Sequence, residues 1–456
     1  MTPAARLSAA IELIQTIEAQ RIPAAQALKE WGSAHRFAGS GDRAAIAGLV
    51  WDVLRRRASS AWLMDHDAPR SRVLGMLKLE RGMDVAVIAA LCDGGRFAPE
   101  PLTEAERAAL TSRTLEGAPP FVAGDYPEWL DPYLAQTFGE DRVAEAAAMA
   151  RRAPLDLRVN TLKARREKVL ASLAHIGAQP TPWSPAGLRI ELAADARNVG
   201  IHAEEDFIKG LVEVQDEGSQ LAALLSAAKP GEQVIDLCAG AGGKTLALAA
   251  MMQGKGRLIA TDDDKRQLAP IHERLSRAGV HNAEVRTPKG EADPLADIKA
   301  SADLIVIDAP CSGTGTWRRN PDAKWRMRPG ALEVRLKDQA EVLDRAASMV
   351  KPGGRIAYIT CSVLPAENAD QVRAFLSRHG EFAPVPPSQT VTVLGDKADD
   401  FAAATRQSAE GLLMTPHRTG TDGFFVSVLK RNASSPAAVV NRARGHRHSA
   451  DDDDPE

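Results

Sequence analysis

Two of the four cysteines stand directly after apolar segments that are typical of buried strands. Cys311 follows ADLIVIDAP (302–310), and Cys361 follows GRIAYIT within the segment TCSVLPAEN (360–368). A lone cysteine is usually a small buried hydrophobic residue. Two cysteines that each end a strand beside Pro, Ser or Gly favour chemistry instead, because a thiolate is a strong nucleophile. Asp308, three residues before Cys311, adds an acid or hydrogen-bonding group at the same place.

A glycine-rich segment, Asp236-Leu-Cys-Ala-Gly-Ala-Gly-Gly-Lys-Thr245, leads from another strand-like run into an apolar helix. Its glycines let the backbone approach a ligand closely at a helix N-terminus. A phosphate-binding P-loop would need glycine where Cys238 stands, and a dinucleotide motif would need glycine where Thr245 stands. A pocket for S-adenosylmethionine and a plain strand-to-helix turn both fit the segment.

An acid follows the next strand-like run. Asp262 ends RLIATD (257–262), 26 residues after Asp236. A carboxylate at this place can accept hydrogen bonds from both ribose hydroxyls of a nucleoside cofactor. This position suits NAD as well as S-adenosylmethionine, so the spacing leaves both open.

Apolar runs at 233–238, 257–262, 302–310, 354–362 and 422–431 must position these residues. The first four alternate with helical stretches, a pattern that predicts a parallel sheet covered on both faces. Ligands of such sheets bind at the carboxyl ends of the strands. We therefore predict an α/β fold in which the glycine-rich segment, Asp308 and both cysteines share one rim.

The rest of the chain shows other patterns of secondary structure. Residues 1–125 are typical of helices, with Leu7, Ile11 and Ile14 on one face and Asp42 before a second apolar run. Residues 126–214 mix a helix at 139–151, strands at 155–160 and 187–192 and a basic helix at 163–176, which predicts a small α+β module. The polar and acidic segment 432–456 predicts a disordered tail.

Composition sets the class of protein. The 456 residues are 44% hydrophobic and 26% charged, as in a globular enzyme, which excludes a mainly disordered, collagen-like or disulfide-framework chain. The net charge of −3 hides asymmetry, because DDDDPE at the end is acidic and 151–168 holds seven Lys or Arg against two acids. No apolar stretch is typical of a signal peptide or membrane span. The scattered cysteines lack zinc-ligand spacing, so we expect a reducing compartment and no metal.

These motifs together resemble a known family. The segments DLCAGAGGKT, DAPCSGTGTWRRNPDAKW and TCSVLPAEN, with LRVNTLK (157–163), QDEGSQL (215–221) and TDGFFVSVLKR, resemble the RsmB/Sun (NOL/NOP/Sun) family of RNA 5-methylcytosine methyltransferases. The N-terminal third, which includes GDRAAIAGLVWDVLRRR, is similar to the NusB-type helical RNA-binding domain. The chain would then act on a cytosine of RNA, which we expect to be small-subunit ribosomal RNA because of the NusB-like part.

The resemblance implies an architecture. A NusB-like domain at 1–125 and an RNA-binding α+β module at 126–214 would precede a Rossmann-like class I methyltransferase domain at 215–431, with a mostly parallel seven-stranded sheet. It implies S-adenosylmethionine as cofactor and RNA as partner, with neither membrane nor metal. We expect a cytoplasmic monomer.

The resemblance also implies residue roles. Carbon 5 of cytosine is a poor nucleophile until a thiolate adds to carbon 6. Cys361 is implied as that thiolate and Cys311 as the group that assists release, with Asp308 and Lys244 as further catalytic residues. The implied cofactor-binding residues are Cys238, Ala239, Gly240, Ala241, Gly242, Gly243, Lys244, Asp262 and Asp308. The implied substrate-binding residues are Arg158, Asn160, Pro310, Arg318 and Arg319.

Further basic side chains are candidate contacts to RNA phosphates. They are Lys163, Arg165, Arg166, Lys324 and Arg326. The chain departs from the family after the strand expected near 283–287, where a Gly-Asp pair is usual and AEVRTPKGEADP stands here, with Glu291 or Asp293 as substitutes. The alternative function is a catalytically silent RNA-binding or ribosome-assembly factor. Both cysteines are present, which weighs against it.

Overall fold

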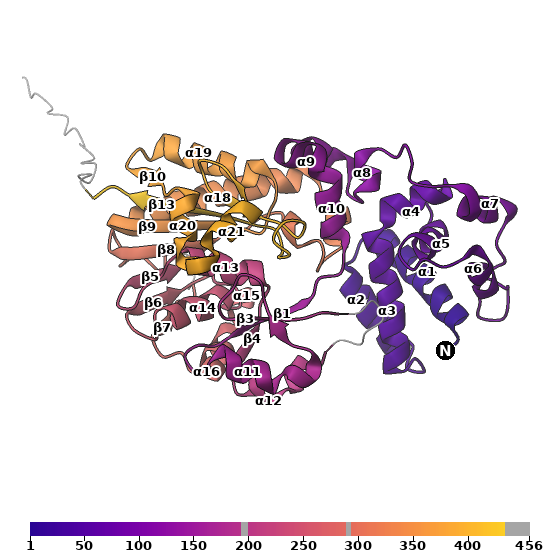
Figure 1. Ribbon diagram of the computed structural model, residues 1–456, viewed down its shortest axis with the longest axis horizontal. Coiled ribbons are helices and arrows are strands. Elements are labelled where there is room, and N and C mark those ends of the chain that lie inside the picture. The colour runs from indigo at the N-terminus through magenta and orange to yellow at the C-terminus, as the bar shows by residue number, and fades with distance from the viewer. Residues whose placement is uncertain (193–198, 289–292, 434–456) are drawn as a thin grey trace, which may run out of the picture.

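The computed structural model describes residues 1–192, 199–288 and 293–433. An all-helical N-terminal third lies beside a larger part that holds the strands (Figure 1). No helix among the described residues is long and apolar enough to cross a membrane. The predicted disordered tail lies, from residue 434 on, outside the described residues.

Three helices of the helical third, α1 (Pro3–Gln20), α3 (Ser40–Arg55) and α7 (Glu104–Ser112), begin at polar side chains that hydrogen-bond to the backbone at the start of the helix. The Thr2 hydroxyl accepts a hydrogen bond from the backbone N–H of Ala5 at the start of α1. The Asp42 carboxylate accepts one from Gly39 at the start of α3, which is the place the sequence indicated. Leu7 and Ile14 are buried in one cluster with residues of the other helices. Those helices are α2 (Ala24–Ala34), α3, α4 (Arg57–Met64), α5 (Pro69–Leu79), α6 (Val85–Leu91) and α7. The short α8 (Pro120–Ala123) follows them, and its Phe121 packs against the cluster of the large sheet instead.

A small antiparallel sheet follows. Its order is β2-β3-β1-β4, and its strands are β1 (Leu155–Val159), β2 (Gln179–Pro180), β3 (Gly187–Ile190) and β4 (Val212–Val214). The short helices α11 (Arg166–Ser172) and α12 (Glu205–Ile208) accompany it. Leu157, Leu188 and Val212 are fully buried in its own cluster. The small α+β module predicted for this region is confirmed.

Two helices before this sheet pack elsewhere. Leu134 and Phe138 of α9 (Asp131–Phe138) and Met149 of α10 (Arg142–Ala150) belong to the hydrophobic cluster of the large sheet. Although they are close in sequence to the small module, these helices therefore support the part of the fold that carries the cysteines.

The large sheet is mixed and has nine strands, in the order β11-β12-β13-β9-β8-β5-β6-β7 with β10 also paired to β13. Strands β5 to β9 pair in parallel, and β10 to β13 pair antiparallel. The bounds are β5 (Gln233–Asp236), β6 (Arg257–Ala260), β7 (Ala283–Val285), β8 (Ala302–Asp308), β9 (Val350–Thr360), β10 (Phe382–Pro384), β11 (Arg406–Gln407), β12 (Leu412–Met414) and β13 (Phe424–Arg431). The Rossmann-like α/β fold is confirmed. The sheet has nine strands rather than seven because strands of two or three residues leave no readable pattern.

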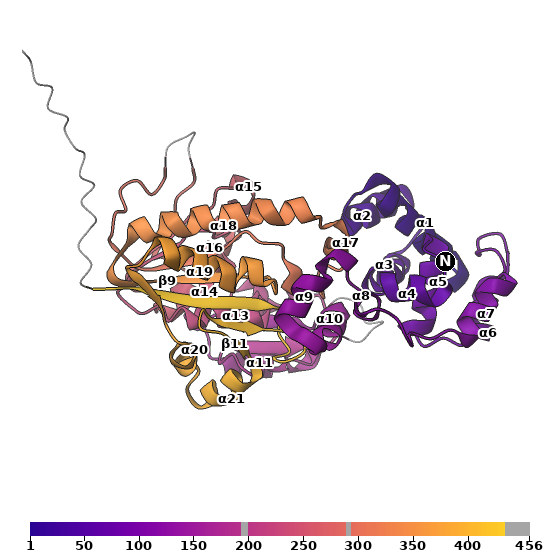
Figure 2. The same ribbon diagram turned by 90° about the horizontal axis from the view of Figure 1, so that it is seen from above.

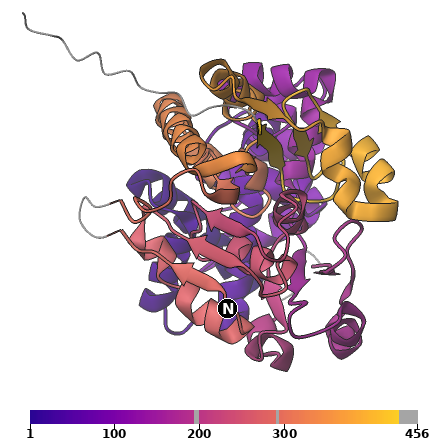
Figure 3. The same ribbon diagram turned by 90° about the vertical axis from the view of Figure 1, so that its left-hand side faces the viewer.

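Successive strand residues point to opposite faces of this sheet. Ile235 and Ile305 lie in the cluster on one face, and Val234 and Leu304 lie in the cluster on the other. Helices α18 (Pro329–Met349) and α19 (Ala369–Arg378) cover the first face. Helices α13 (Glu217–Leu225), α14 (Gly243–Met251), α16 (Ile271–Ala278) and α21 (Ala398–Ala404) cover the second. Figure 3 looks at this part from the end opposite the helical third.

The helical third is joined to the sheet part through α17 (Ala323–Arg326), which Figure 2 shows beside α2 and α3. The Trp325 indole N–H donates to the carbonyl of Leu54 at 2.7 Å, and Lys324 Nζ donates to the carbonyl of Arg55 at 3.2 Å. In the other direction, the Arg55 guanidinium donates to the carbonyl of Arg318 at 2.7 Å. The segment after Cys311 is thus fixed against the helical third by hydrogen bonds.

Candidate functional site

The two cysteines meet because their strands are neighbours. Strands β8 and β9 pair in parallel, so the segments that follow them leave the same edge of the sheet. The Sγ atoms of Cys311 and Cys361 are 3.4 Å apart, and both side chains are partly exposed. The hydrogen bond with Cys361 and burial together raise the pKa of Cys311 well above the ordinary thiol value. Cys311 therefore keeps its proton, and its thiol lies within hydrogen-bonding distance of the Cys361 sulfur.

A buried carboxylate ties the two cysteine segments together. Glu367, fully buried, accepts hydrogen bonds from the Ser312 backbone N–H at 2.7 Å and the Ser312 hydroxyl at 2.5 Å. Gln339 donates to Glu367 at 3.1 Å and to the carbonyl of Pro310 at 2.9 Å. The sequence interpretation gave Glu367 no role, although it lies in the segment TCSVLPAEN. Its position six residues after Cys361 was the only available signal.

Two glycines allow a third segment to approach. Gly315 donates its N–H to the carbonyl of Cys361 at 2.9 Å, and Gly423 donates to the carbonyl of Gly315 at 2.8 Å. A Cβ atom on Gly315 would lie 2.2 Å from the carbonyl oxygen of Gly423. Only glycine fits at this crossing, which brings the start of β13 against the cysteine segments.

The glycine-rich segment turns from β5 into α14 as predicted. Gly240 and Gly242 have φ angles of 49° and 85°, a conformation that L side chains rarely adopt. A Cβ atom on Gly242 would lie 2.5 Å from Ile271 Cγ1, so glycine is required there. The Asp262 carboxylate accepts from the Gly240 N–H at 2.9 Å, and Arg274 donates to the Ala241 carbonyl at 2.7 Å.

The remaining residues of this segment lie in the same turn. Ala239 donates its N–H to the Thr261 carbonyl at 3.0 Å, and α14 begins at Gly243. Burial and nearby carboxylates raise the pKa of Cys238 well above the ordinary thiol value. The thiol of this third cysteine therefore stays protonated and lines the turn. A backbone turn held to an acid on the next strand fits the ribose and amino-acid parts of S-adenosylmethionine.

Asp236 differs from Asp262 in its exposure. It is completely buried, and its Oδ2 accepts a hydrogen bond from the Thr245 hydroxyl at 2.7 Å. Burial raises the pKa of Asp236 to about 7, with the carboxylates of Asp308 and Asp262 adding to the effect. Asp236 therefore lies at the base of the glycine-rich turn, where its hydrogen bond with Thr245 fixes the start of α14.

Lys244 and Asp308 form an ion pair next to the turn. The Lys244 Nζ lies 2.6 Å from Asp308 Oδ2 and 3.3 Å from the Ser219 hydroxyl, and it sits 5.0 Å from the centre of the Phe424 ring. The Lys244 side chain is only 5% exposed, whereas that of Asp308 is 36% exposed. Lys244 is thus a buried anchor, and Asp308 presents a carboxylate to a ligand at the strand end.

Arg318 and Arg319 pair with acids of the protein. With Asp216 and Asp422 they form a cluster, here called the Arg–Asp cluster, in which all members but Arg319 are buried. Arg318 donates to Asp216 at 2.9 Å and to Asp422, and Arg319 donates to the same two acids at 2.7 and 2.6 Å. Burial alone would raise the pKa of Asp216, but the two guanidinium groups outweigh it and lower the value. Both arginines therefore have a structural role, and contact of the 30% exposed Arg319 with RNA stays a prediction.

Other predicted RNA contacts are also used internally. Asn160 donates to the carbonyls of Gly210 and Ala278, both at 2.9 Å, and Lys163 Nζ donates to the carbonyls of Lys209 and Arg277 at 2.9 and 2.7 Å. Both N–H groups of the Asn160 amide are used in this way, so its side chain has no free donor for a substrate. Lys163 is exposed and keeps a third N–H, so its phosphate contact stays a prediction.

Two more predicted contacts are buried cations. Arg158 is buried on β1, where burial lowers its pKa to about 10, and Lys324 is 1% exposed, where burial lowers its pKa to about 7. Arg165 and Arg326 are exposed and Arg166 is half-buried, so these three stay as candidate phosphate contacts. The spacing of polar residues along a helix or strand does not show which of their side chains are buried.

The acid expected on the adenine side has no equivalent among the described residues next to β7. Glu291 lies outside the described residues. Asp293 accepts from Arg345 at 2.6 Å and from the Leu295 N–H at 2.9 Å. Asp293 is therefore already held by α18.

We predict that Asp262→Ala weakens binding of S-adenosylmethionine by about 1–3 kcal/mol, because the carboxylate is lost both to the ribose hydroxyls and to the Gly240 N–H. Isothermal titration calorimetry measures this. Asp263→Ala is the matched control, since that neighbouring side chain is 92% exposed. Equal affinities of the two variants would remove Asp262 from the cofactor site.

Comparisons with known proteins agree with this geometry. Residues 223–430 match the family model described as 16S rRNA methyltransferase RsmB/F, and residues 126–197 match that of an RsmF/B-like ferredoxin-like domain. The probable ribosomal RNA small subunit methyltransferase B of Synechocystis sp. is 29% identical over 424 residues, which are 86% of this chain and 91% of that protein.

Two further proteins extend the comparison. The ribosomal RNA small subunit methyltransferase B of Salmonella typhi is 35% identical over 284 residues, which are 60% of this chain and 65% of that protein. A solved structure of a methyltransferase homolog from Pyrococcus horikoshii is 25% identical, with a TM-score of 0.54 over 68% of this chain and 97% of that one.

Proposed function

We propose that this member of the RsmB/F family of methyltransferases, which use S-adenosylmethionine, methylates carbon 5 of a cytosine in small-subunit ribosomal RNA. The reaction proceeds through a covalent adduct with Cys361. The observation that carries the proposal is the 3.4 Å separation of the Cys311 and Cys361 sulfur atoms beside Asp308. Two cysteines at one strand edge have no use in simple methyl transfer to a good nucleophile.

The Cys361 thiolate begins the reaction by forming a bond from Sγ to carbon 6 of the cytosine. The electron pair of the carbon 5–carbon 6 double bond then shifts toward carbon 5 and N3. Asp308, held by Lys244 at 2.6 Å, is the group at the rim that stabilises the N3 edge by a hydrogen bond or a proton. S-adenosylmethionine supplies the electrophilic methyl group that carbon 5 takes.

Cys311 completes the reaction. Its pKa is raised first of all by its hydrogen bond with Cys361, and also by burial and by the charge of Cys361. Once Cys361 is a neutral thioether, two of these causes are gone and Cys311 ionises more readily. Cys311 releases its own proton to water, and the resulting thiolate takes the proton from carbon 5. The carbon 5–carbon 6 double bond then reforms, N3 returns any proton it received to Asp308, and the bond between carbon 6 and Sγ of Cys361 breaks. Cys361 leaves as a thiolate.

The regions outside the sheet part are proposed to bind RNA. We assign residues 1–125 and 126–214 to this role, with the methyltransferase domain at 215–431. Exposed cations such as Arg165 and Arg326 supply favourable charge for phosphates.

The test is methyl transfer in solution. The full-length protein is mixed with S-adenosylmethionine labelled in the methyl group and with unmodified small-subunit ribosomal RNA, and the RNA is digested to nucleosides. We expect label in 5-methylcytidine. Label in another nucleoside, or RNA binding without label, would overturn the proposed reaction. Large-subunit RNA is the matched control for the substrate.

A further inference from the structure

A cavity at the junction of the helical third and the sheet part is unusually rich in aromatic side chains. Its volume is about 640 Å³, and Trp62, Phe121, Trp129, Trp325 and Met327 line it. We call it the aromatic junction pocket. Phe, Trp and Tyr make up only 4% of the chain, so four such rings around one cavity are a strong local concentration.

The walls of this pocket lead directly to the cysteine segments. Trp325 and Met327 lie 14 and 16 residues after Cys311, in and just after α17. Trp129 lies in the turn before α9, and the Thr137 hydroxyl of α9 donates to the carbonyl of Val363, two residues after Cys361, at 3.0 Å. The pocket is therefore connected to both catalytic segments rather than isolated in the helical third.

Positive charge accompanies the rings. The Arg57 guanidinium carbon lies 5.3 Å from the centre of the Trp325 ring within the pocket, and the same group pairs with Glu18 at 3.3 Å. Arg326 and Arg328, on either side of Met327, are exposed. Asp67 also lines the pocket, but it pairs with Arg72. Flat rings beside cations match the chemistry of unpaired nucleotides, which stack their bases and carry anionic phosphates.

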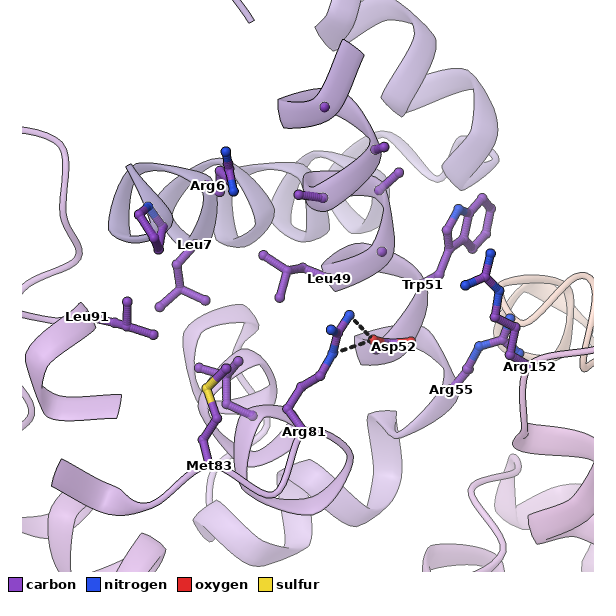
Figure 4. Close-up of a pocket in the computed structure, with 17 residues that line it drawn as sticks. Arg6, Leu7, Leu49, Trp51, Asp52, Arg55, Arg81, Met83, Leu91 and Arg152 are labelled. Atoms are coloured by element: carbon purple, nitrogen blue, oxygen red, sulfur yellow. Dashed lines mark hydrogen bonds and ion pairs between the residues drawn. The ribbon is translucent and has the colours of Figure 1, made fainter. Parts of the chain in front are cut away.

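A second cavity of similar size lacks this combination. It has a volume of about 610 Å³, lies between α1, α3 and α5, and contains one aromatic ring, that of Trp51 (Figure 4). Arg81 there pairs with Asp52 at 2.5 Å, and Arg6 pairs with Asp42 at 2.8 Å. Ion pairs within the protein occur at both cavities, since Arg326 beside the aromatic junction pocket pairs with Asp322 at 3.2 Å. The two cavities differ in their rings, because a single ring offers little stacking area.

We propose that the aromatic junction pocket binds unpaired bases of the RNA next to the target cytosine, with Trp62 and Trp129 as the stacking residues. This inference rests on the proposed function for its substrate. It adds a second point of contact, outside the cofactor rim, that selects RNA whose target lies in a single-stranded or unstacked region.

The experiment measures binding of a fluorescein-labelled, unpaired oligoribonucleotide to the full-length protein by fluorescence anisotropy. Trp62→Ala and Trp129→Ala should each weaken binding about 5- to 100-fold, as expected for the loss of one stacked base. Trp62→Phe should stay within about threefold of the wild type, because the ring is retained. The same RNA annealed into a duplex should bind more weakly to the wild type and be insensitive to the substitutions.

Trp51→Ala is the matched control, since Trp51 lines the other cavity. It should keep wild-type RNA affinity. Calorimetric binding of S-adenosylmethionine should be unchanged in every variant, which shows that the sheet part is intact.

Wild-type RNA affinity in Trp62→Ala and Trp129→Ala would overturn the inference and leave the pocket to an apolar protein partner. Equal weakening in Trp51→Ala would overturn it as well. The proposed function fails separately, if no 5-methylcytidine forms while the tryptophan variants still lose RNA affinity.

Discussion

Cys361→Ala is expected to abolish methylation and to form no protein–RNA adduct. The Sγ atom that would bond to carbon 6 is gone, and Cys311 at 3.4 Å cannot replace it at the same position. Activity should fall by several orders of magnitude, to the background of the labelled assay. RNA affinity should stay near that of the wild type, because the substitution removes only one thiol.

Cys311→Ala is expected to fail at the opposite end of the reaction. Cys361 still adds to carbon 6 and carbon 5 still takes the methyl group, but no group at hand removes the proton from carbon 5. An adduct between protein and RNA should therefore accumulate and survive denaturing electrophoresis. Cys92→Ala, at a buried cysteine of the helical third, is the control and should keep full activity without an adduct.

The pair of variants is decisive because each outcome assigns a role. An adduct in Cys361→Ala and none in Cys311→Ala would show that Cys311 is the nucleophile. Two active, adduct-free variants would reduce both cysteines to packing residues and leave the methyl transfer without a covalent step.

The arrangement of the strands was predictable from the sequence because it depends on local patterns. Short apolar runs between helical stretches gave β5, β6, β8 and β9 to within a few residues, and β13 as the last strand. Parallel pairing then brings the strand ends to one edge, so the meeting of Cys311 with Cys361 followed from topology. The turn at Gly240 and Gly242 followed from the need for positive φ.

The partners of charged side chains were not predictable in the same way. Arg318 and Arg319 follow a cysteine segment in a basic stretch, which on sequence grounds indicates an RNA contact. Their acids, Asp216 and Asp422, are 102 or more residues away. Only the packing of β13 and the start of α13 against this segment reveals the pairs. Asp216 lies in QDEGSQL and Asp422 in TDGFFVSVLKR, two segments that carry the family resemblance. The resemblance implied no role for either acid.

Arg318→Ala is therefore expected to destabilise the protein strongly in the absence of RNA. The Arg318, Asp216 and Asp422 side chains are 6%, 6% and 3% exposed, so the substitution leaves two buried carboxylates that share the single guanidinium of Arg319. Loss of one partner from a buried ion-pair cluster costs about 3–5 kcal/mol. Urea unfolding followed by circular dichroism measures this change in the free energy of unfolding.

Two further variants separate this role from an RNA contact. Arg335→Ala breaks an ion pair with Asp338 whose side chains are 46% and 36% exposed, and should change the free energy of unfolding by less than about 1 kcal/mol. Arg318→Lys keeps the charge but not the fork of donors that reaches both acids, and should recover only part of the lost stability. If Arg318→Ala were as stable as the wild type and bound RNA weakly, the arginine would contact phosphate after all. The cluster would then hold together through Arg319 alone.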